Sequence, residues 1–161
     1  MTDFKMLLSE FEKHNVKFII VGGVAAVAHG SARSTSDLDI VYERSKENLK
    51  NIVQALAPYK PYLRGAPPGL PFFWDEVMLE NGLNFTLSTQ LGSIDLLGEI
   101  LGGGTYENMR NGSVKIEVFG YSCFVLDLPT LLKTKKAAGR PKDLEVLAEL
   151  EALLDESSGK K

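Results

Sequence analysis

Two carboxylates separated by a single residue, Asp37 and Asp39, follow the glycine pair Gly22-Gly23 after thirteen intervening residues. A glycine turn that ends an apolar strand can bring backbone N–H groups up to phosphates. Side chains alternate across a strand, so the two carboxylates share one face with their origins roughly 7 Å apart. Carboxylate oxygens suit Mg²⁺, which shares its ligand shell with phosphate oxygens, and Mn²⁺ accepts the same ligands. This pattern predicts metal-dependent chemistry on a nucleoside triphosphate.

A third carboxylate, Asp95, repeats the arrangement in a second short apolar strand, residues 93–97. If this strand lies beside the strand that carries Asp37 and Asp39, three carboxylates converge on one face of a sheet. Such anions repel one another strongly unless cations neutralise them. The alternative for each carboxylate alone is an ordinary solvated strand face. We predict that Asp37, Asp39 and Asp95 are both the metal ligands and the catalytic residues.

Polar residues that could meet phosphates lie between the glycine pair and the first carboxylate. Arg33 carries a guanidinium, which can bind phosphate through two hydrogen bonds, and Thr35 offers a hydroxyl donor. The alternative is that residues 31–36 form an ordinary solvated loop.

A basic segment, residues 133–142, holds five cations and no anion in a chain whose formal net charge is -3. Lys133 and Lys136 lie three residues apart and share a helix face. Arg140 stands just before Pro141, at a helix cap position that Ser, Thr, Asp or Asn usually occupies. A solubilising surface is the alternative. The predicted nucleotide-binding residues are Gly22, Gly23, Arg33, Thr35, Lys133, Lys136 and Arg140.

Helices and strands in alternation must position these side chains. Apolar periodicity and the placement of proline and glycine indicate helices at residues 3–14, 24–29, 45–57, 129–138 and 141–154. Branched and aromatic runs indicate strands at residues 16–21, 37–42, 84–89, 93–97, 114–118 and 121–126. Proline and glycine predict a long irregular loop at residues 58–82 and a flexible link at 102–104.

This order of elements is typical of an α/β (α+β) fold with a mixed central sheet and helices packed on it. With 161 residues, we expect one domain at 1–156 and a frayed tail at 157–161. The lone Cys123 lies in an apolar run, which predicts a buried thiol. No apolar run approaches the roughly 18 residues of a membrane span. The polar N-terminus lacks a signal-peptide pattern, so we expect a cytoplasmic location and no membrane partner.

The glycine pair, the run Asp37-Leu38-Asp39 and Asp95 together resemble the signature of the DNA polymerase β-like nucleotidyltransferase superfamily. The resemblance extends over nearly the whole chain. Residues 33–40, 84–86, 92–99 and 138–143 look like the small prokaryotic branch related to AbiEii-type nucleotidyltransferase toxins. One position departs from the pattern, because many members carry Ser after the first glycine, where this chain has Gly23.

The resemblance implies a nucleotidyltransferase fold and a Mg²⁺-dependent enzyme that moves a nucleoside monophosphate from an NTP to an acceptor hydroxyl. The acceptor would be a small molecule, a protein or an RNA end. The resemblance also implies metal binding at Asp37 and Asp39, a third carboxylate at Asp95, and phosphate contacts from Gly22 and Gly23. A toxin-type component with an antitoxin-like partner protein is a further role that it implies.

Two other functions stay open from the sequence. A catalytically lapsed nucleotide- or partner-binding module of the same fold is expected to lose a carboxylate, and none is missing here. A nucleic-acid-binding subunit would use the basic segment and the aromatic run at 72–74, but the net charge of -3 argues against this as the main role. A Rossmann dinucleotide binder is excluded, because no G-x-G-x-x-G follows the first strand.

Overall fold

The structure, a computed structural model, describes residues 1–159 of the chain and the side chains of residues 1–157. Its helices are α1 (Phe4–Lys13), α2 (Gly22–Ala28), α3 (Lys46–Leu56), α4 (Glu76–Asn81), α5 (Tyr106–Met109), α6 (Leu128–Ala138) and α7 (Pro141–Gly159). Its strands are β1 (Phe18–Val21), β2 (Asp37–Tyr42), β3 (Tyr62–Leu63), β4 (Asn84–Thr89), β5 (Gly92–Leu97), β6 (Glu99–Ile100), β7 (Gly104–Thr105), β8 (Ser113–Val118) and β9 (Tyr121–Leu126). Short 3-10 turns lie at Ala57–Tyr59 and Arg110–Gly112.

In the described part of the chain, seven strands form one mixed sheet in the order β3-β4-β5-β2-β1-β9-β8. β2 runs parallel to β5 and antiparallel to β1, and β1 runs parallel to β9. The pairs β3/β4, β4/β5 and β8/β9 are antiparallel. The predicted mixed central sheet is therefore confirmed. Because β2 and β5 are parallel neighbours, both strands start at the same edge of the sheet.

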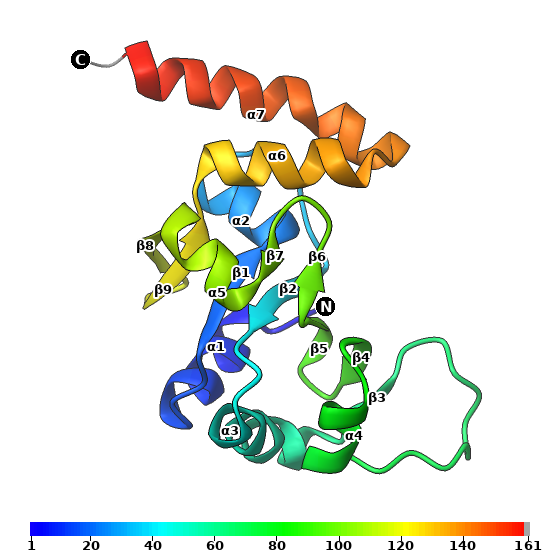
Figure 1. Ribbon diagram of the computed structural model, residues 1–161. Helices are drawn as coiled ribbons and strands as arrows, with labels where there is room; N and C mark the ends of the chain where they lie inside the picture. Colours follow the sequence, from blue (N-terminus) through cyan, green and yellow to red (C-terminus); the bar gives the residue numbers. More distant parts are fainter. Residues whose placement is uncertain (160–161) are drawn as a thin grey trace.

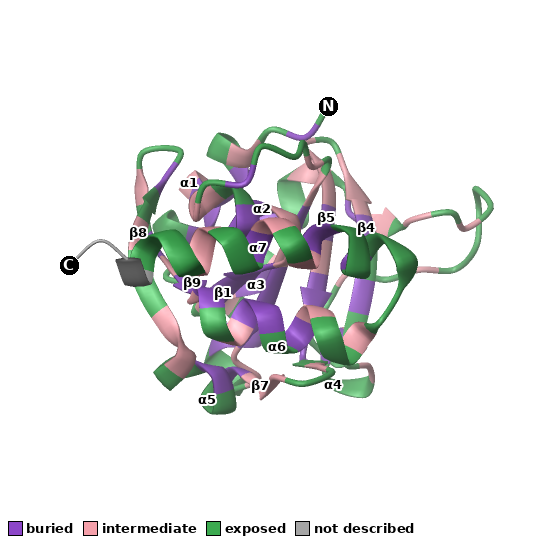
Figure 2. Ribbon diagram, turned by 90° about the horizontal axis from the view of Figure 1, so that it is seen from above, coloured by how far each residue is buried: buried purple, intermediate pink, exposed green. Residues whose placement is uncertain are grey.

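Helices cover the sheet from both sides (Figure 1). α2, α6 and α7 stack on one side, while α1, α3 and α4 lie on the other. The strands seen beneath α6 and α7 in Figure 2 are largely buried. Leu38, Ile40 and Leu96 have no exposed surface, and alternation along the strands puts Asp37 and Asp39 on the opposite face from them.

Short polar side chains begin several helices by accepting hydrogen bonds from backbone N–H groups. Ser45 precedes α3 and accepts from the backbone of Asn48 at 3.2 Å. Asp75 precedes α4 and accepts from the backbone of Met78 at 2.9 Å. These caps are local sequence signals, although the sequence analysis used only the one at Ser45.

Two segments that the sequence analysis predicted to be irregular contain regular structure. Residues 58–82, predicted to be irregular, contain the short strand β3 and the capped helix α4. Residues 102–104, predicted to be a flexible link, belong to the turn of the β6–β7 hairpin and to its second strand. The strands β3, β6 and β7 are too short to show a pattern of their own, whereas the start of α4 carried a local signal, Asp75, that the sequence analysis did not use. α7 continues to Gly159, so residues 157–159 are helical, and residues 160–161 lie outside the described residues.

None of the helices in residues 1–159 combines the length and the apolar character that crossing a membrane requires.

Candidate active site

The three predicted carboxylates come together on one face of the sheet. In the parallel pair β2/β5, Asp39 lies directly opposite Asp95, and Asp37 lies opposite Ser93. On the other side of β2, Asp39 lies opposite Val21, the last residue of β1. Directly opposed residues point to the same face of a sheet. β2 and β5 are therefore neighbours, so Asp95 lies on the same face as Asp37 and Asp39.

The pKa of the Asp39 carboxyl is strongly shifted. Burial raises the pKa of Asp39 to about 7, and the charges of Asp95 and Asp37 act in the same direction, against a smaller opposing effect of Lys135. Its Oδ1 atom is buried and has no hydrogen-bond partner. A buried carboxylate with an oxygen left unpaired, beside two other carboxylates, is a chemical environment that a divalent cation would stabilise.

The donor set fits Mg²⁺ or Mn²⁺, with Asp37, Asp39 and Asp95 as the residues that would hold the ion. Among the described residues, however, no three acidic, histidine or cysteine side chains are gathered into a ready-made metal cluster. Two of the carboxylates instead face an arginine. Arg64 Nη1 lies 3.8 Å from Asp37 Oδ2, and Arg64 Nη2 lies 2.9 Å from Asp95 Oδ1.

Arg64 is a site residue that the sequence analysis missed. It directly follows β3, and its backbone N–H donates to the carbonyl of Thr86 at 2.9 Å. Its Nη2 donates to the carbonyls of Leu87 at 2.7 Å and Ile94 at 3.3 Å. No local signal in the sequence marks this residue, because its contacts depend on β3 pairing with β4 beside β5.

The glycine pair approaches the carboxylates closely. Gly22 has a φ of +66°, and a Cβ on it would collide with the carboxylate of Asp39. A Cβ added to Gly23 would lie only 2.6 Å from Thr35 Oγ1. Gly22 thus begins α2 at a position that only glycine fits. The side chain of Thr35 lies directly against Gly23.

A buried carboxylate, Asp143, organises the cations of the basic segment. Its oxygens accept from Arg140 Nε at 2.6 Å, from Arg140 Nη2 at 3.1 Å and from Lys135 Nζ at 3.3 Å. Burial alone would raise the pKa of Asp143, but the hydrogen bonds from Arg140 and Lys135 hold that pKa below its usual range. Asp143 therefore stays charged and fixes both cations on the side of Asp39.

Two adjoining hollows border the carboxylates. One, of about 310 Å³, has Gly23, Arg33, Thr35, Asp37 and Lys142 in its lining. The other, of about 270 Å³, is lined more by apolar side chains, with Gly22 at one wall. The lining of both includes Asp39, Lys135, Arg140 and Asp143. The first hollow thus combines hydroxyl groups with cations, both of which can bind phosphate oxygens.

The structure does not bring every predicted cation to this site. Lys133 and Lys136 are exposed, neither lines either hollow, and Lys136 Nζ lies 3.9 Å from Glu151. Lys135, which the sequence analysis passed over, takes the inward position instead. Its spacing from the buried Leu128, Leu131 and Leu132 follows the helical repeat, so this periodicity was the signal that could have identified it.

Arg33 lines the 310 Å³ hollow, but its side chain contacts α7. Its Nη2 donates to the carbonyl of Glu145 at 3.1 Å, and its Nε lies 3.8 Å from Glu149. Glu149 also accepts from Ser31 Oγ at 2.6 Å and from the backbone of Ala32 at 3.0 Å. Glu149 was not predicted from the sequence, and it ties the loop at residues 31–36 to the last helix.

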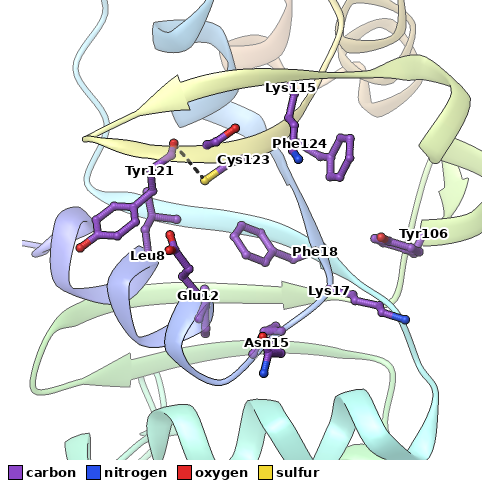
Figure 3. A pocket seen from close by; sticks show the side chains of 13 residues that line it. Leu8, Glu12, Asn15, Lys17, Phe18, Tyr106, Lys115, Tyr121, Cys123 and Phe124 are labelled. Carbon is purple, nitrogen blue, oxygen red and sulfur yellow. Dashed lines mark hydrogen bonds between the residues drawn. The ribbon is translucent and has the colours of Figure 1, made fainter.

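A separate hollow of about 510 Å³ lies near the start of β1 and contains none of the predicted site residues in its lining (Figure 3). Figure 3 shows Phe18, Phe124 and Cys123 around it. Cys123 is buried and free, as predicted. Burial raises the pKa of its thiol to about 11, so the thiol stays protonated and unreactive at neutral pH.

Comparisons with known proteins bear on the fold of the chain. No protein-family model and no curated protein matches the sequence. Among solved structures, the chain is similar to lincomycin-bound LnuA, a lincosamide antibiotic adenylyltransferase, with a TM-score of 0.61 and 16% identity over 94% of this chain and 98% of that one. It is also similar to a proposed nucleotidyltransferase from Thermotoga maritima, with a TM-score of 0.57 and 14% identity over 89% of this chain and 86% of that one. The chain therefore has the nucleotidyltransferase fold.

Proposed function

We propose that this protein is a metal-dependent nucleotidyltransferase that moves a nucleoside monophosphate from an NTP to an acceptor hydroxyl. The observation that carries the proposal is the register of β2 and β5, which sets Asp39 opposite Asp95. Asp37 lies on the same face, and Lys135 and Arg140 line the same 310 Å³ hollow as Asp37. The fold shared with nucleotidyltransferases supports the same proposal.

In this proposal the three carboxylates would hold Mg²⁺, or Mn²⁺ in its place. When bound, the ion or ion pair would polarise the α-phosphorus and stabilise the attacking and leaving oxygens of an in-line displacement. Asp37 and Asp39 would hold the ion whose remaining ligand positions the triphosphate oxygens can take. Asp95 takes the proton from the acceptor hydroxyl. As this happens, the acceptor oxygen forms a bond to the α-phosphorus, and the bond from the α-phosphorus to the oxygen that bridges it to the β-phosphorus breaks.

The leaving pyrophosphate carries charge that cations must offset. Lys135 and Arg140, both held by Asp143, border the hollow that offers hydroxyl donors from the loop at 31–36. Cations fixed in advance stabilise developing charge better than mobile ones, because they need no reorganisation during the reaction. The same two residues would therefore bind the triphosphate and stabilise its departure.

The acceptor is proposed to approach over β4 and β5. Thr86 lies opposite Asp95 on β4 and is exposed, so this part of the sheet is open beside the third carboxylate. LnuA is a lincosamide antibiotic adenylyltransferase and matches the chain along almost its full length. That match favours a small-molecule acceptor for this chain. A protein or RNA acceptor, and a toxin-type role with an antitoxin-like partner, stay predictions from the sequence resemblance.

The test is transfer of label from each α-labelled NTP, with Mg²⁺, to small hydroxyl compounds, total RNA and protein in separate reactions. We expect label in one acceptor class, and none with Asp39→Asn or Asp95→Asn. Asp95→Asn is expected to keep its NTP affinity, because this residue is assigned to the acceptor side. Transfer that survives loss of both Asp37 and Asp39 would contradict the assignment of the metal ligands.

A further inference from the structure

Arg64 places a positive charge against two of the three carboxylates, from a segment that the reaction scheme above does not use. Its guanidinium lies 2.9 Å from Asp95 and 3.8 Å from Asp37, and its side chain is 27% exposed. Hydrogen bonds from Nη2 to the carbonyls of Leu87 and Ile94 hold it at this point of the sheet. The contact is thus built into the fold by β4 and β5, and it is not the chance approach of a long surface side chain.

We propose that Arg64 is an internal counter-ion that holds Asp37 and Asp95 in the metal-free protein and competes with the metal for them. This inference rests on the proposed function, because it takes the carboxylates as the metal ligands. Three converging carboxylates repel one another, and a single guanidinium between two of them offsets part of that repulsion. Asp95 Oδ1, although close to Arg64, has no hydrogen-bond partner, so it keeps a lone pair for another ligand.

A divalent cation and a guanidinium cannot both lie against the same oxygens without repelling each other. Metal binding to the free protein must therefore displace Arg64 from Asp37 and Asp95, which weakens the metal affinity. A metal that arrives with a triphosphate brings compensating negative charge, so the penalty is smaller. Arg64 would thus favour loading of the metal together with the nucleotide over loading of the metal alone.

Displacement would also act on the segment that follows. Residues 65–71 project from the body of the molecule between β3 and α4 (Figure 1), and Phe72 and Trp74 beyond them pack against the core. The far end of this segment is held where Trp74 Nε1 donates to the carbonyl of Val53 at 3.0 Å. Its near end begins at Arg64, so the same contact links the state of the carboxylates to this projecting loop.

The experiment measures Mn²⁺ binding to the whole protein without nucleotide, by electron paramagnetic resonance of free Mn²⁺. We expect Arg64→Gln to bind Mn²⁺ roughly ten-fold more tightly than the wild type, because one competing charge within a few ångströms is gone. Arg64→Lys keeps the charge and is expected to stay much closer to the wild type. Arg110→Gln is the matched control, because Arg110 stacks on Phe124 with its guanidinium carbon 3.8 Å from the ring centroid.

A second readout is thermal unfolding with EDTA and with Mn²⁺. We expect Arg64→Gln to unfold at a lower temperature than the wild type in EDTA and to gain more stability from Mn²⁺. Equal or weaker Mn²⁺ binding by Arg64→Gln would overturn the proposal, and so would an equal gain in Arg110→Gln, which would show a long-range charge effect. The Mn²⁺ measurements use neither nucleotide nor acceptor. A failure to find transferase activity would therefore overturn the proposed function without changing the result for Arg64.

Discussion

At Asp39, burial and two neighbouring carboxylates act on one carboxyl group in the same direction. The pKa of Asp39 is raised from 3.8 to about 7, first by burial and then by Asp95 and Asp37. Between these two pH values the folded protein holds a proton that the unfolded chain has released. The free energy of unfolding of the metal-free protein should therefore fall as the pH rises from about 4 to 7.

Asp39→Asn should remove this pH dependence, since the amide does not titrate. The raised pKa corresponds to a penalty of at most about 4 kcal/mol above pH 7, and coupling to Asp95 makes the realised gain smaller. We expect Asp39→Asn to be more stable than the wild type at pH 8 in EDTA and nearly equal to it at pH 4.5. Urea unfolding at both pH values checks this, with the exposed Asp155→Asn as control. A wild-type stability that does not fall over this range would contradict the prediction.

The two neighbouring lysines of α6 separate a site residue from a surface residue. Lys135 lies against Asp143 and the hollow, whereas Lys136 is exposed and faces Glu151. A charge-assisted contact to phosphate contributes on the order of 1.5–3 kcal/mol, so Lys135→Gln should weaken NTP binding roughly ten- to hundred-fold. Lys136→Gln, a screened surface change, should alter it by less than about three-fold.

Titration calorimetry with a non-hydrolysable NTP and Mg²⁺ compares these two variants directly. An equal loss of NTP affinity in both variants would mean that the basic segment acts only through its overall positive charge, whatever the position of each lysine on the helix. A loss in Lys136→Gln alone would support the pattern expected from the sequence over the one seen in the structure.

Among the elements, α7 supports the loop at residues 31–36, which borders the 310 Å³ hollow beside the carboxylates. Glu149→Gln should loosen that loop, because the carboxylate that accepts from Ser31 Oγ and from the backbone N–H of Ala32, and that pairs with Arg33, is replaced by a neutral amide. We expect faster hydrogen exchange at the amide of Ala32 and weaker NTP binding. The hydrogen bonds hold the pKa of Glu149 below its usual range, so the same loosening should set in at acidic pH in the wild type.

Glu145→Gln is the matched control for this change. Arg33 donates to the backbone carbonyl of Glu145, and this contact does not require the side-chain charge. Exchange at Ala32 should stay at the wild-type rate in this variant. Unchanged exchange in Glu149→Gln as well would mean that the loop is held by its own structure and not by α7.

For the molecule as a whole, the packing of α7 predicts how far the chain can be shortened from its C-terminal side before the fold is lost. Val146 and Leu150 of α7 are buried in the core, and Asp143 has no exposed surface, so α7 packs on the core and contributes to the site. We expect a chain of residues 1–156 to keep its melting temperature and NTP affinity. A chain of residues 1–140 should lose both, because it exposes the apolar contacts of α6 and leaves Lys135 without Asp143. Thermal unfolding and calorimetry compare the two truncations, and equal stability would place α7 outside the folding unit.

The sequence by itself determined the local features of this protein. β2 and β4 have the same bounds in the structure as in the sequence analysis, and Ser45 caps α3 where a helix start was expected. The Asp37 and Asp39 spacing and the glycine pair were also readable, because strand alternation and the need for glycine at a crowded turn are properties of a few consecutive residues.

Only the tertiary structure decided which residues surround the carboxylates. The pairing of β2 with β5 puts Asp95 opposite Asp39, the pairing of β3 with β4 delivers Arg64, and α7 delivers Glu149. These contacts join segments far apart in the chain, and their energies depend on burial and charge that no local window contains. Lys135 lies between the two cases, because helical periodicity points it inward, while its pairing with Asp143 required α6 and α7 to be packed together.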